Sequence, residues 1–121
     1  MQVIEVGNNI IIGTAIDHSE TYRVSEGKAS YVVLETTMIA LSGTTPSLTV
    51  TVEQSSDLVN WSAVSMASTH TTNTAIEYKR TESPSPTSPN LVLQPYLRLK
   101  YTPMGTTTKF LFSARLTVIE T

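Results

Sequence analysis

The chain has 121 residues, 15% of them charged, a net charge of −2 and no cysteine. This length fits one domain, 1–121, with a single core. The 8 basic residues are spread along the chain, which argues against a nucleic-acid partner. The missing cysteine excludes disulfides, thiolate metal sites and cysteine nucleophiles.

Hydroxyl side chains dominate the polar composition, with 20 threonines and 14 serines. The branched β-carbon of threonine favours strands, so this composition suits an all-β protein. Apolar runs extend over only a few residues, and the start MQVIEVGNN lacks the pattern of a signal peptide. We therefore expect a protein that folds where it is made and has no membrane partner.

The first half of the chain predicts several strands. In VIEVGNNIIIG, 3–13, Gly7-Asn8-Asn9 separates two apolar runs and predicts a tight hairpin, because these residues tolerate positive φ. SYVVLETTMIAL, 30–41, predicts a strand with Val32, Leu34, Met38 and Ala40 on one face, which SGTTP, 42–46, ends. SLTVTVE, 47–53, has the period-two alternation of a half-buried antiparallel strand.

The second half begins with a return strand at Trp61. This strand is expected to end in a loop, MASTHTTNT, 66–74. Strand structure is expected to resume at AIEYKRT, 75–81. Residues 81–95 hold four of the 6 prolines and predict an extended surface connection, because proline lacks the N–H that a central strand donates. YLRLKYT, a turn at 103–105 and TTTKFLFSARLTVI then predict a closing hairpin.

These short strands, with turn signals roughly every 8–12 residues, predict an all-β fold of two packed antiparallel sheets, a jelly-roll-like β-sandwich. A closed barrel is the alternative. No segment has a sustained helical period with caps, so little or no helix is expected. The predicted core consists of Leu48, Val50, Val52, Leu97, Leu99, Phe110, Phe112, Leu116 and Val118.

A polar segment joins the predicted strand at 47–53 to the return strand that begins at Trp61. We call this segment, Ser55-Ser56-Asp57-Leu58-Val59-Asn60-Trp61, 55–61, the knot. Asp57 is expected to accept a hydrogen bond from the backbone two residues on, and Asn60 to take a left-handed conformation. Trp61 then supplies a large apolar body over an edge of the core. The knot is interpreted as a hairpin connection with a packing tryptophan.

The knot resembles the Ser-x-Asp-Gly-x-Asn-Trp turn of small β-sandwich modules of virions, with Ser55, Asp57, Asn60 and Trp61 matching and Leu58 in place of the glycine. The end of the chain, YLRLKYTPMGTTTKFLFSARLTV, resembles the closing hairpin of tailed-phage capsid cement, or decoration, proteins. The two stretches cover about a third of the sequence. The resemblance implies a bacteriophage virion component, assembled in the host cytoplasm, that binds capsid or other virion proteins on the outside of an assembled shell.

Catalytic signatures are weak. Asp17, His18 and Ser19 are neighbours, and neighbours on a strand point to opposite faces, so they cannot form a catalytic triad. Two histidines, two aspartates and no cysteine offer no zinc-ligand spacing. Glu35 and Glu53 are interpreted as exposed-face residues, since a chain of this size has little scaffold for a glycosidase cleft. We expect no cofactor, no metal and no enzymatic activity.

Two binding classes remain. The first is a structural assembly protein, which is expected to be a homo-oligomer because a weakly charged, threonine-rich surface has little to prevent association. The second is a carbohydrate-binding or adhesion module, so a glycan partner stays open. A glycan platform needs exposed aromatic side chains, and the candidates for it are Trp61, Tyr22, Tyr78 and Tyr96.

The proline-rich loop at 81–95 is expected to contact a partner, because loops of about 15 residues without secondary structure are usually functional or disordered. Its prolines restrict the free chain and lower the entropy lost on docking. The predicted contact residues are Pro84, Pro86, Pro89 and Leu91, together with Trp61 of the knot. The alternative is that Leu91, Val92 and Leu93 form a short strand of the sheet.

Overall fold

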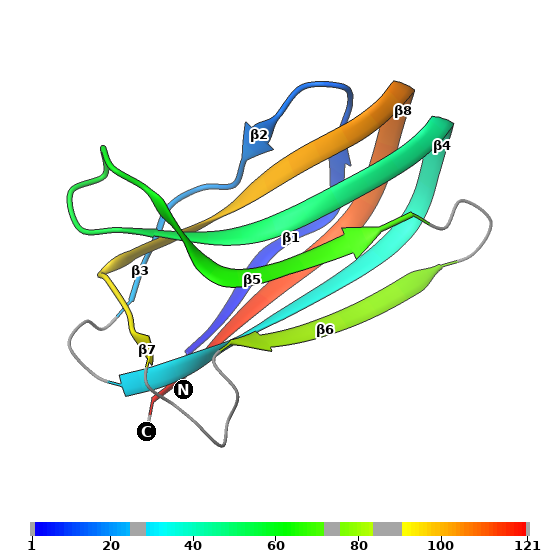
Figure 1. The fold of residues 1–121 in the computed structure, drawn as a ribbon. Helices are drawn as coiled ribbons and strands as arrows, with labels where there is room; N and C mark the ends of the chain where they lie inside the picture. Colours follow the sequence, from blue (N-terminus) through cyan, green and yellow to red (C-terminus); the bar gives the residue numbers. More distant parts are fainter. Residues whose placement is uncertain (1, 25–28, 72–75, 84–90, 121) are drawn as a thin grey trace.

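A computed structural model describes residues 2–24, 29–71, 76–83 and 91–120. Strands make up most of this part of the chain, and it contains no helix. Accordingly, no helix long and apolar enough to cross a membrane occurs there. The strands are β1 (Gln2–Ile12), β2 (Asp17–His18), β3 (Tyr22–Arg23), β4 (Ala29–Ser55), β5 (Ser62–His70), β6 (Glu77–Ser83), β7 (Leu91–Val92) and β8 (Tyr96–Glu120) (Figure 1).

Two long strands, β4 and β8, organise the fold. They pair antiparallel along almost their whole length, from Ser30 opposite Glu120 to Ser55 opposite Tyr96. The ribbon that they form bends over itself where the register shifts, between Ser42 and Ser47 of β4. Gly43 and Gly105 have positive φ at this bend, a conformation that glycine adopts without strain. The bend divides each strand into two halves that lie in different layers (Figure 1).

The other strands extend each layer. In the first sheet the order is β1, the carboxy-terminal half of β8, the amino-terminal half of β4, then β6. In the second sheet it is β2 and β3, the amino-terminal half of β8, the carboxy-terminal half of β4, then β5. This is the strand order of a jelly roll, so the predicted jelly-roll-like β-sandwich is confirmed.

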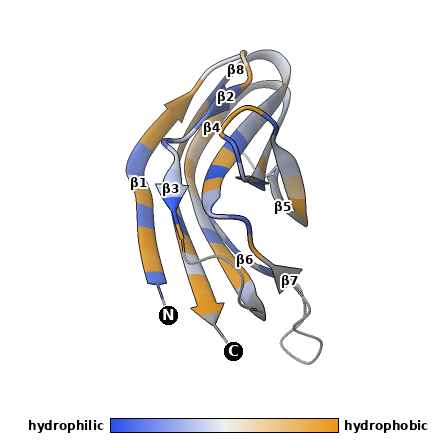
Figure 2. Ribbon diagram, turned by 90° about the vertical axis from the view of Figure 1, so that its left-hand side faces the viewer, coloured by the Kyte–Doolittle hydropathy of each residue, from blue (hydrophilic) through white to orange (hydrophobic). Residues whose placement is uncertain are grey.

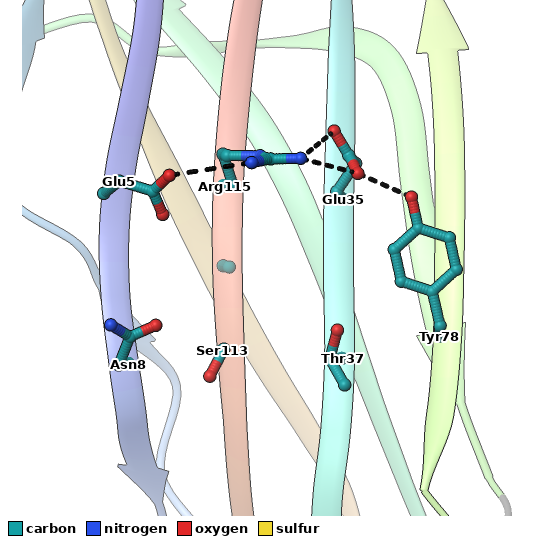
Figure 3. Close-up of a pocket in the computed structure, with 8 residues that line it drawn as sticks. Glu5, Asn8, Glu35, Thr37, Tyr78, Ser113 and Arg115 are labelled. Carbon is teal, nitrogen blue, oxygen red and sulfur yellow. Dashed lines mark hydrogen bonds and ion pairs between the residues drawn. The ribbon is translucent and has the colours of Figure 1, made fainter.

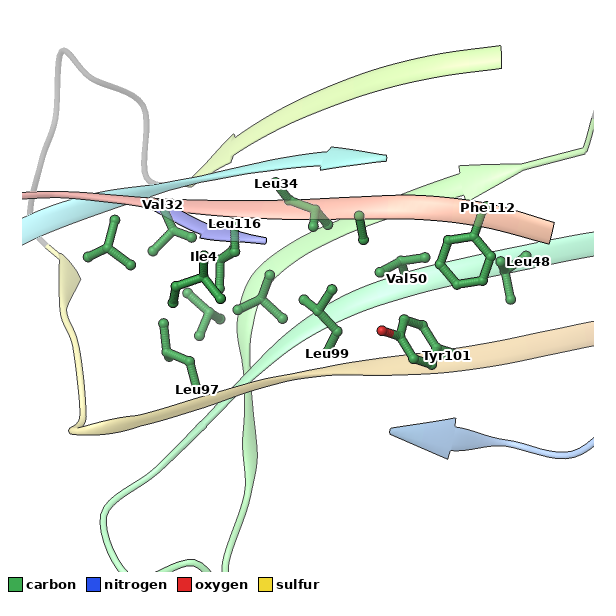
Figure 4. Close-up of a cluster of buried hydrophobic side chains, with 14 of the residues drawn as sticks. Ile4, Val32, Leu34, Leu48, Val50, Leu97, Leu99, Tyr101, Phe112 and Leu116 are labelled. Atoms are coloured by element: carbon green, nitrogen blue, oxygen red, sulfur yellow. The ribbon is translucent and has the colours of Figure 1, made fainter. Parts of the chain in front are cut away.

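The core lies between the two sheets (Figure 4). All nine predicted core residues are buried, because alternate residues of each strand face the opposite sheet. Tyr101 of the second sheet meets Phe112 of the first edge to face, with ring centroids 5.2 Å apart. Hydrophobic and hydrophilic bands alternate along β1, as expected for a strand with one face toward the core (Figure 2).

Three predicted turns are wrong. Gly7-Asn8-Asn9 does not end a strand: β1 continues to Ile12, and its pairing with β8 shifts register on both sides of Gly7, which makes the segment a bulge. Asn9 takes positive φ there. The predicted stops at 42–46 and 103–105 lie inside β4 and β8. In each case the neighbouring strand continues and supplies hydrogen-bond partners, so a residue that tolerates a turn bends the strand instead.

Three other expectations also need correction. Ala40 is exposed and does not share the buried face of Val32, Leu34 and Met38, because the register shifts between Met38 and Ala40. The expected 66–74 loop begins later, since β5 continues to His70. The connection at 81–95 is shorter than predicted, because β6 extends to Ser83, next to the first proline, and β7 pairs with the start of β4.

Candidate functional site

The knot is a compact loop held by its own side chains at the junction of β4 and β5. The buried Ser55 hydroxyl accepts hydrogen bonds from the backbone N–H groups of Asp57, at 3.2 Å, and Leu58, at 2.9 Å. The Asp57 carboxylate accepts from the N–H groups of Val59 and Asn60, at 2.9 and 2.8 Å, and from the Asn60 amide. The predicted turn at Asp57 is therefore confirmed.

Electrostatics reinforce this loop. The backbone N–H of Asn60, followed by that of Val59, holds the pKa of Asp57 well below its usual range. The carboxylate therefore stays ionised at any pH near neutrality, and it keeps accepting the hydrogen bonds of Val59, Asn60 and the Ser55 hydroxyl. The knot is thus pre-organised without help from a ligand.

The left-handed residue of the knot is Leu58, with φ of 66°, and not Asn60 as predicted. Leu58 occupies the position where the resembling virion turn has glycine, and the hydrogen bonds of Ser55 and Asp57 on either side impose the conformation. A left-handed conformation costs an ordinary residue about 1–2 kcal/mol.

The tip of the knot is apolar and open to solvent. Val59 is 78% exposed and Leu58 is 50% exposed. We call these two residues the knot tip. Sequence reasoning singled out Trp61 and the polar residues but missed the tip. The only available signal was the replacement of the expected glycine by Leu58.

Trp61 packs on a charged neighbour of the second sheet, not on the apolar core. The guanidinium carbon of Arg98 lies 4.0 Å from the centroid of the Trp61 ring, a cation–π arrangement. Arg98 also donates to the Glu53 carboxylate at 2.9 Å, directly across the strand pair. This stack supports the base of the knot and leaves Trp61 half-buried. Its predicted role in partner binding stays a prediction.

The other predicted contact residues lie in the proline-rich connection. Pro84, Pro86 and Pro89 fall outside the described residues. Leu91 belongs to β7, whose backbone pairs with Ala29 and Ser30 of β4. The alternative of a short strand is thereby confirmed for Leu91 and Val92, and the side chain of Leu93 is buried. Partner contact by this connection stays a prediction.

The first histidine, His18, lies near a carboxylate and not in a catalytic chain. Its Nε2 atom is 3.8 Å from Glu53 Oε1. The Ser19 hydroxyl donates to the Glu20 carbonyl and accepts from the Leu99 N–H, so it is committed to the backbone. Across the described ranges, no group of three or more potential ligands could hold a metal ion.

The second histidine, His70, is buried and not part of a loop as expected. Its Nδ1 atom lies 3.1 Å from Glu77 Oε2, and its Nε2 atom lies 2.6 Å from the Thr36 hydroxyl. Since a carboxylate only accepts, the Nδ1–H donates to Glu77 and Nε2 accepts from Thr36. Ser68 bonds Thr36 at 2.8 Å. Both hydroxyls are buried, so neither meets a substrate and the cluster is structural.

Stability should fall with acidification because of His70. Burial lowers the pKa of His70, although the hydrogen bond and charge of Glu77 oppose this. In the unfolded chain the pKa is about 6.5. As pH falls below that value the unfolded state takes up a proton that the folded state refuses, so the free energy of unfolding decreases by up to about 1.4 kcal/mol per pH unit. Urea denaturation at several pH values between about 5 and 8 measures this decrease in the free energy of unfolding.

The matched control for this prediction is the exposed His18. We expect His70→Gln to flatten the pH dependence and His18→Gln to keep it. Equal slopes for the wild type and His70→Gln would contradict the buried neutral histidine.

Comparison with known proteins gives a structural likeness and no sequence relative. No protein-family model and no curated protein sequence matches the chain. A chain in the structure of infectious bursal disease virus, Gt strain, matches 98% of this chain with a TM-score of 0.61 and 12% sequence identity. The match spans 31% of the length of that viral chain. At this identity the likeness shows the fold alone, a β fold like that of the viral chain.

Proposed function

We propose that the protein is a non-enzymatic structural component of a virion that decorates the outside of an assembled shell through protein–protein contacts. The observation that carries this proposal is the fold, because nearly the whole chain superposes on part of a chain from a virus structure. The resemblance of the knot and of the closing hairpin to virion modules agrees with it. Within this proposal the partner is a shell protein and the location is the virion.

The knot tip is the contact that the geometry favours. Leu58 and Val59 project from a loop already fixed by the hydrogen bonds of Ser55 and Asp57, so docking costs little ordering entropy. Exposed apolar side chains on a rigid loop supply the buried centre that a protein interface needs. The strain at Leu58 is then explained by contact with the partner.

Substitutions at the tip separate binding from folding. We expect Leu58→Gly to leave the free energy of unfolding unchanged or to raise it by up to about 1 kcal/mol, because glycine relieves the left-handed strain. The same change, and Val59→Ser, should weaken shell binding at least about fivefold. The measurement is cosedimentation with assembled shells of the virus that encodes the chain, beside urea denaturation of each variant.

Ile76→Ser is the matched control, because Ile76 is 71% exposed and lies outside the knot. It should bind as the wild type does. Failure of the wild-type protein to cosediment with the shells would overturn the decoration role. Normal binding by both tip variants would overturn only the assignment of the contact to the knot. A Gly/Ser replacement of residues 83–89 in the same assay tests the predicted contact of the proline-rich connection.

Self-association is part of the proposal. Ile11, Leu111 and Ala40 align across β1, β8 and β4 on the outer face of the first sheet, beside a cavity of about 200 Å³. Ile11 is largely exposed. A weakly charged surface with such an apolar strip favours association of copies, which sedimentation velocity measures directly.

A further inference from the structure

A polar groove crosses the outer face of the first sheet, on the side away from the core (Figure 3). Antiparallel pairing places Glu5 of β1 and Glu35 of β4 on either side of Arg115 of β8, and these three side chains form a first row. Tyr78 of β6 pairs with Thr37 of β4, and its hydroxyl reaches diagonally to Glu35. The groove encloses a cavity of about 170 Å³. None of the proposed virion contacts uses these side chains.

The side chains of this first row hold one another in place. Arg115 Nη2 donates to both oxygens of Glu35, at 3.0 and 3.1 Å, and Arg115 Nη1 lies 3.8 Å from Glu5. The Tyr78 hydroxyl donates to Glu35 at 2.5 Å. This hydrogen bond, followed by those of Arg115, lowers the pKa of Glu35, and Glu35 in turn raises the pKa of Tyr78. The carboxylate is therefore ionised and the phenol keeps its proton.

A second row lines the same groove beside the first. Thr37 lies opposite Ser113 in the strand pair, and Asn8 stands next to them on β1 (Figure 3). Asn8 is in the bulge, where register shifts flank Gly7 and Asn9 takes positive φ. Bulges next to active sites change the direction in which a side chain points. Within the described part of the chain, no side-chain hydrogen bond engages Asn8, Thr37 or Ser113, so their amide and hydroxyl groups are available to a ligand.

The chemistry of the groove is selective. It offers planar hydrogen-bonding groups with fixed orientation, together with free hydroxyl and amide groups. It also offers an accessible aromatic ring, because Tyr78 is 56% exposed. Two carboxylates face one guanidinium, so an anionic ligand is repelled. Vicinal hydroxyls of a sugar donate to carboxylates and accept from amide and guanidinium N–H groups. The apolar face of a sugar ring packs on an aromatic ring.

We propose that this groove binds one ring of a neutral saccharide, stacked beside Tyr78 and hydrogen-bonded by Asn8, Ser113 and the Glu35–Arg115 pair. The cavity is smaller than the roughly 300–1,000 Å³ of sites for drug-sized ligands, so a single ring fits and binds weakly. Display of many copies on one particle converts such weak binding into avidity. The groove lies on the first sheet and the knot on the second, so the two sites have separate surfaces.

The test is a titration of the isotopically labelled protein, followed by amide chemical shifts. The probes are the methyl glycosides of glucose, galactose, mannose and N-acetylglucosamine at millimolar concentration, with sialyllactose as the anionic comparison. We expect at least one neutral glycoside to shift the amide signals of β1, β4 and β8 around the groove. Tyr78→Ala should weaken this binding about tenfold, and Asn8→Ala should weaken it severalfold.

Two control variants test whether the aromatic ring of Tyr78 carries the binding. Tyr78→Phe keeps the ring and should retain most of the binding, while Tyr96→Ala removes a tyrosine of the second sheet and should have no effect. Absence of any shift at the groove with all four neutral glycosides would overturn the proposal. So would binding that survives Tyr78→Ala and is lost in Trp61→Ala, or preferential binding of sialyllactose. None of these results depends on attachment to a shell.

Discussion

Replacing Phe112 with alanine is expected to lower the free energy of unfolding by about 3–5 kcal/mol. Phe112 is fully buried in the first sheet, and its ring packs in a T-shaped arrangement with Tyr101 of the second sheet. Truncation removes apolar area and leaves a cavity between two layers whose backbones are fixed by the long β4–β8 ribbon, so the site relaxes only partly. Urea denaturation followed by fluorescence or circular dichroism measures the change.

Leu111→Ala is the control, because Leu111 is the next residue and points to the outer face. We expect it to lower the free energy of unfolding by less than about 1.5 kcal/mol. An equal loss in both variants would mean that Phe112 is no more central to folding than its outward neighbour, and the assignment of the two faces of β8 would fail.

The core was predictable because its signal is local. Phe110, Phe112, Ala114, Leu116 and Val118 occupy every second position, and the period of a strand sends alternate side chains to the same face. The prediction failed at Ala40, where the register shift after Met38 reverses the face. A bulge depends on the partner strand, which lies far away in the sequence, so alternation alone could not find it.

The turns were less predictable for a related reason. Gly43 and Gly105 tolerate the conformations of a hairpin turn, yet both lie in a bend of two strands that remain paired. A local sequence allows either outcome. The pairing of β4 with β8, whose paired residues lie more than 40 positions apart in the sequence, decides between them. Non-local pairing of this kind leaves no local trace.

The two candidate sites, the knot and the groove, differ in the same respect: the first depends on local contacts and the second on long-range strand pairing. The hydrogen bonds of Asp57 span only three residues, so the turn at the knot was predicted correctly. The groove draws Glu5, Glu35, Tyr78 and Arg115 from four strands that only the fold brings together. Sequence reasoning interpreted Glu35 as an exposed-face residue. Its outward direction was correct, but its partners depend on register and could not be inferred.

Gly105→Ala is expected to damage the bend on which the jelly roll depends. Gly105 has φ of 112°, and a Cβ added there would lie 2.7 Å from the Thr45 carbonyl oxygen and 2.8 Å from that of Thr44. The contacts are with backbone atoms of β4, which cannot rotate away as a side chain does. Backbone strain of about 1–3 kcal/mol and overpacking of about 1–3 kcal/mol together predict a loss of about 2–6 kcal/mol in the free energy of unfolding.

Gly13→Ala separates this steric effect from the general loss of a glycine, because a Cβ at Gly13 meets no atom within 4 Å and φ is not positive. It should leave stability unchanged or raise it slightly, since alanine restricts the unfolded chain. Gly43→Ala should behave like Gly105→Ala, because its Cβ would lie 2.9 Å from the carbonyl oxygens of Thr106 and Thr107. If Gly105→Ala unfolded at the same urea concentration as the wild type, the two strands could not be folding over each other at this point.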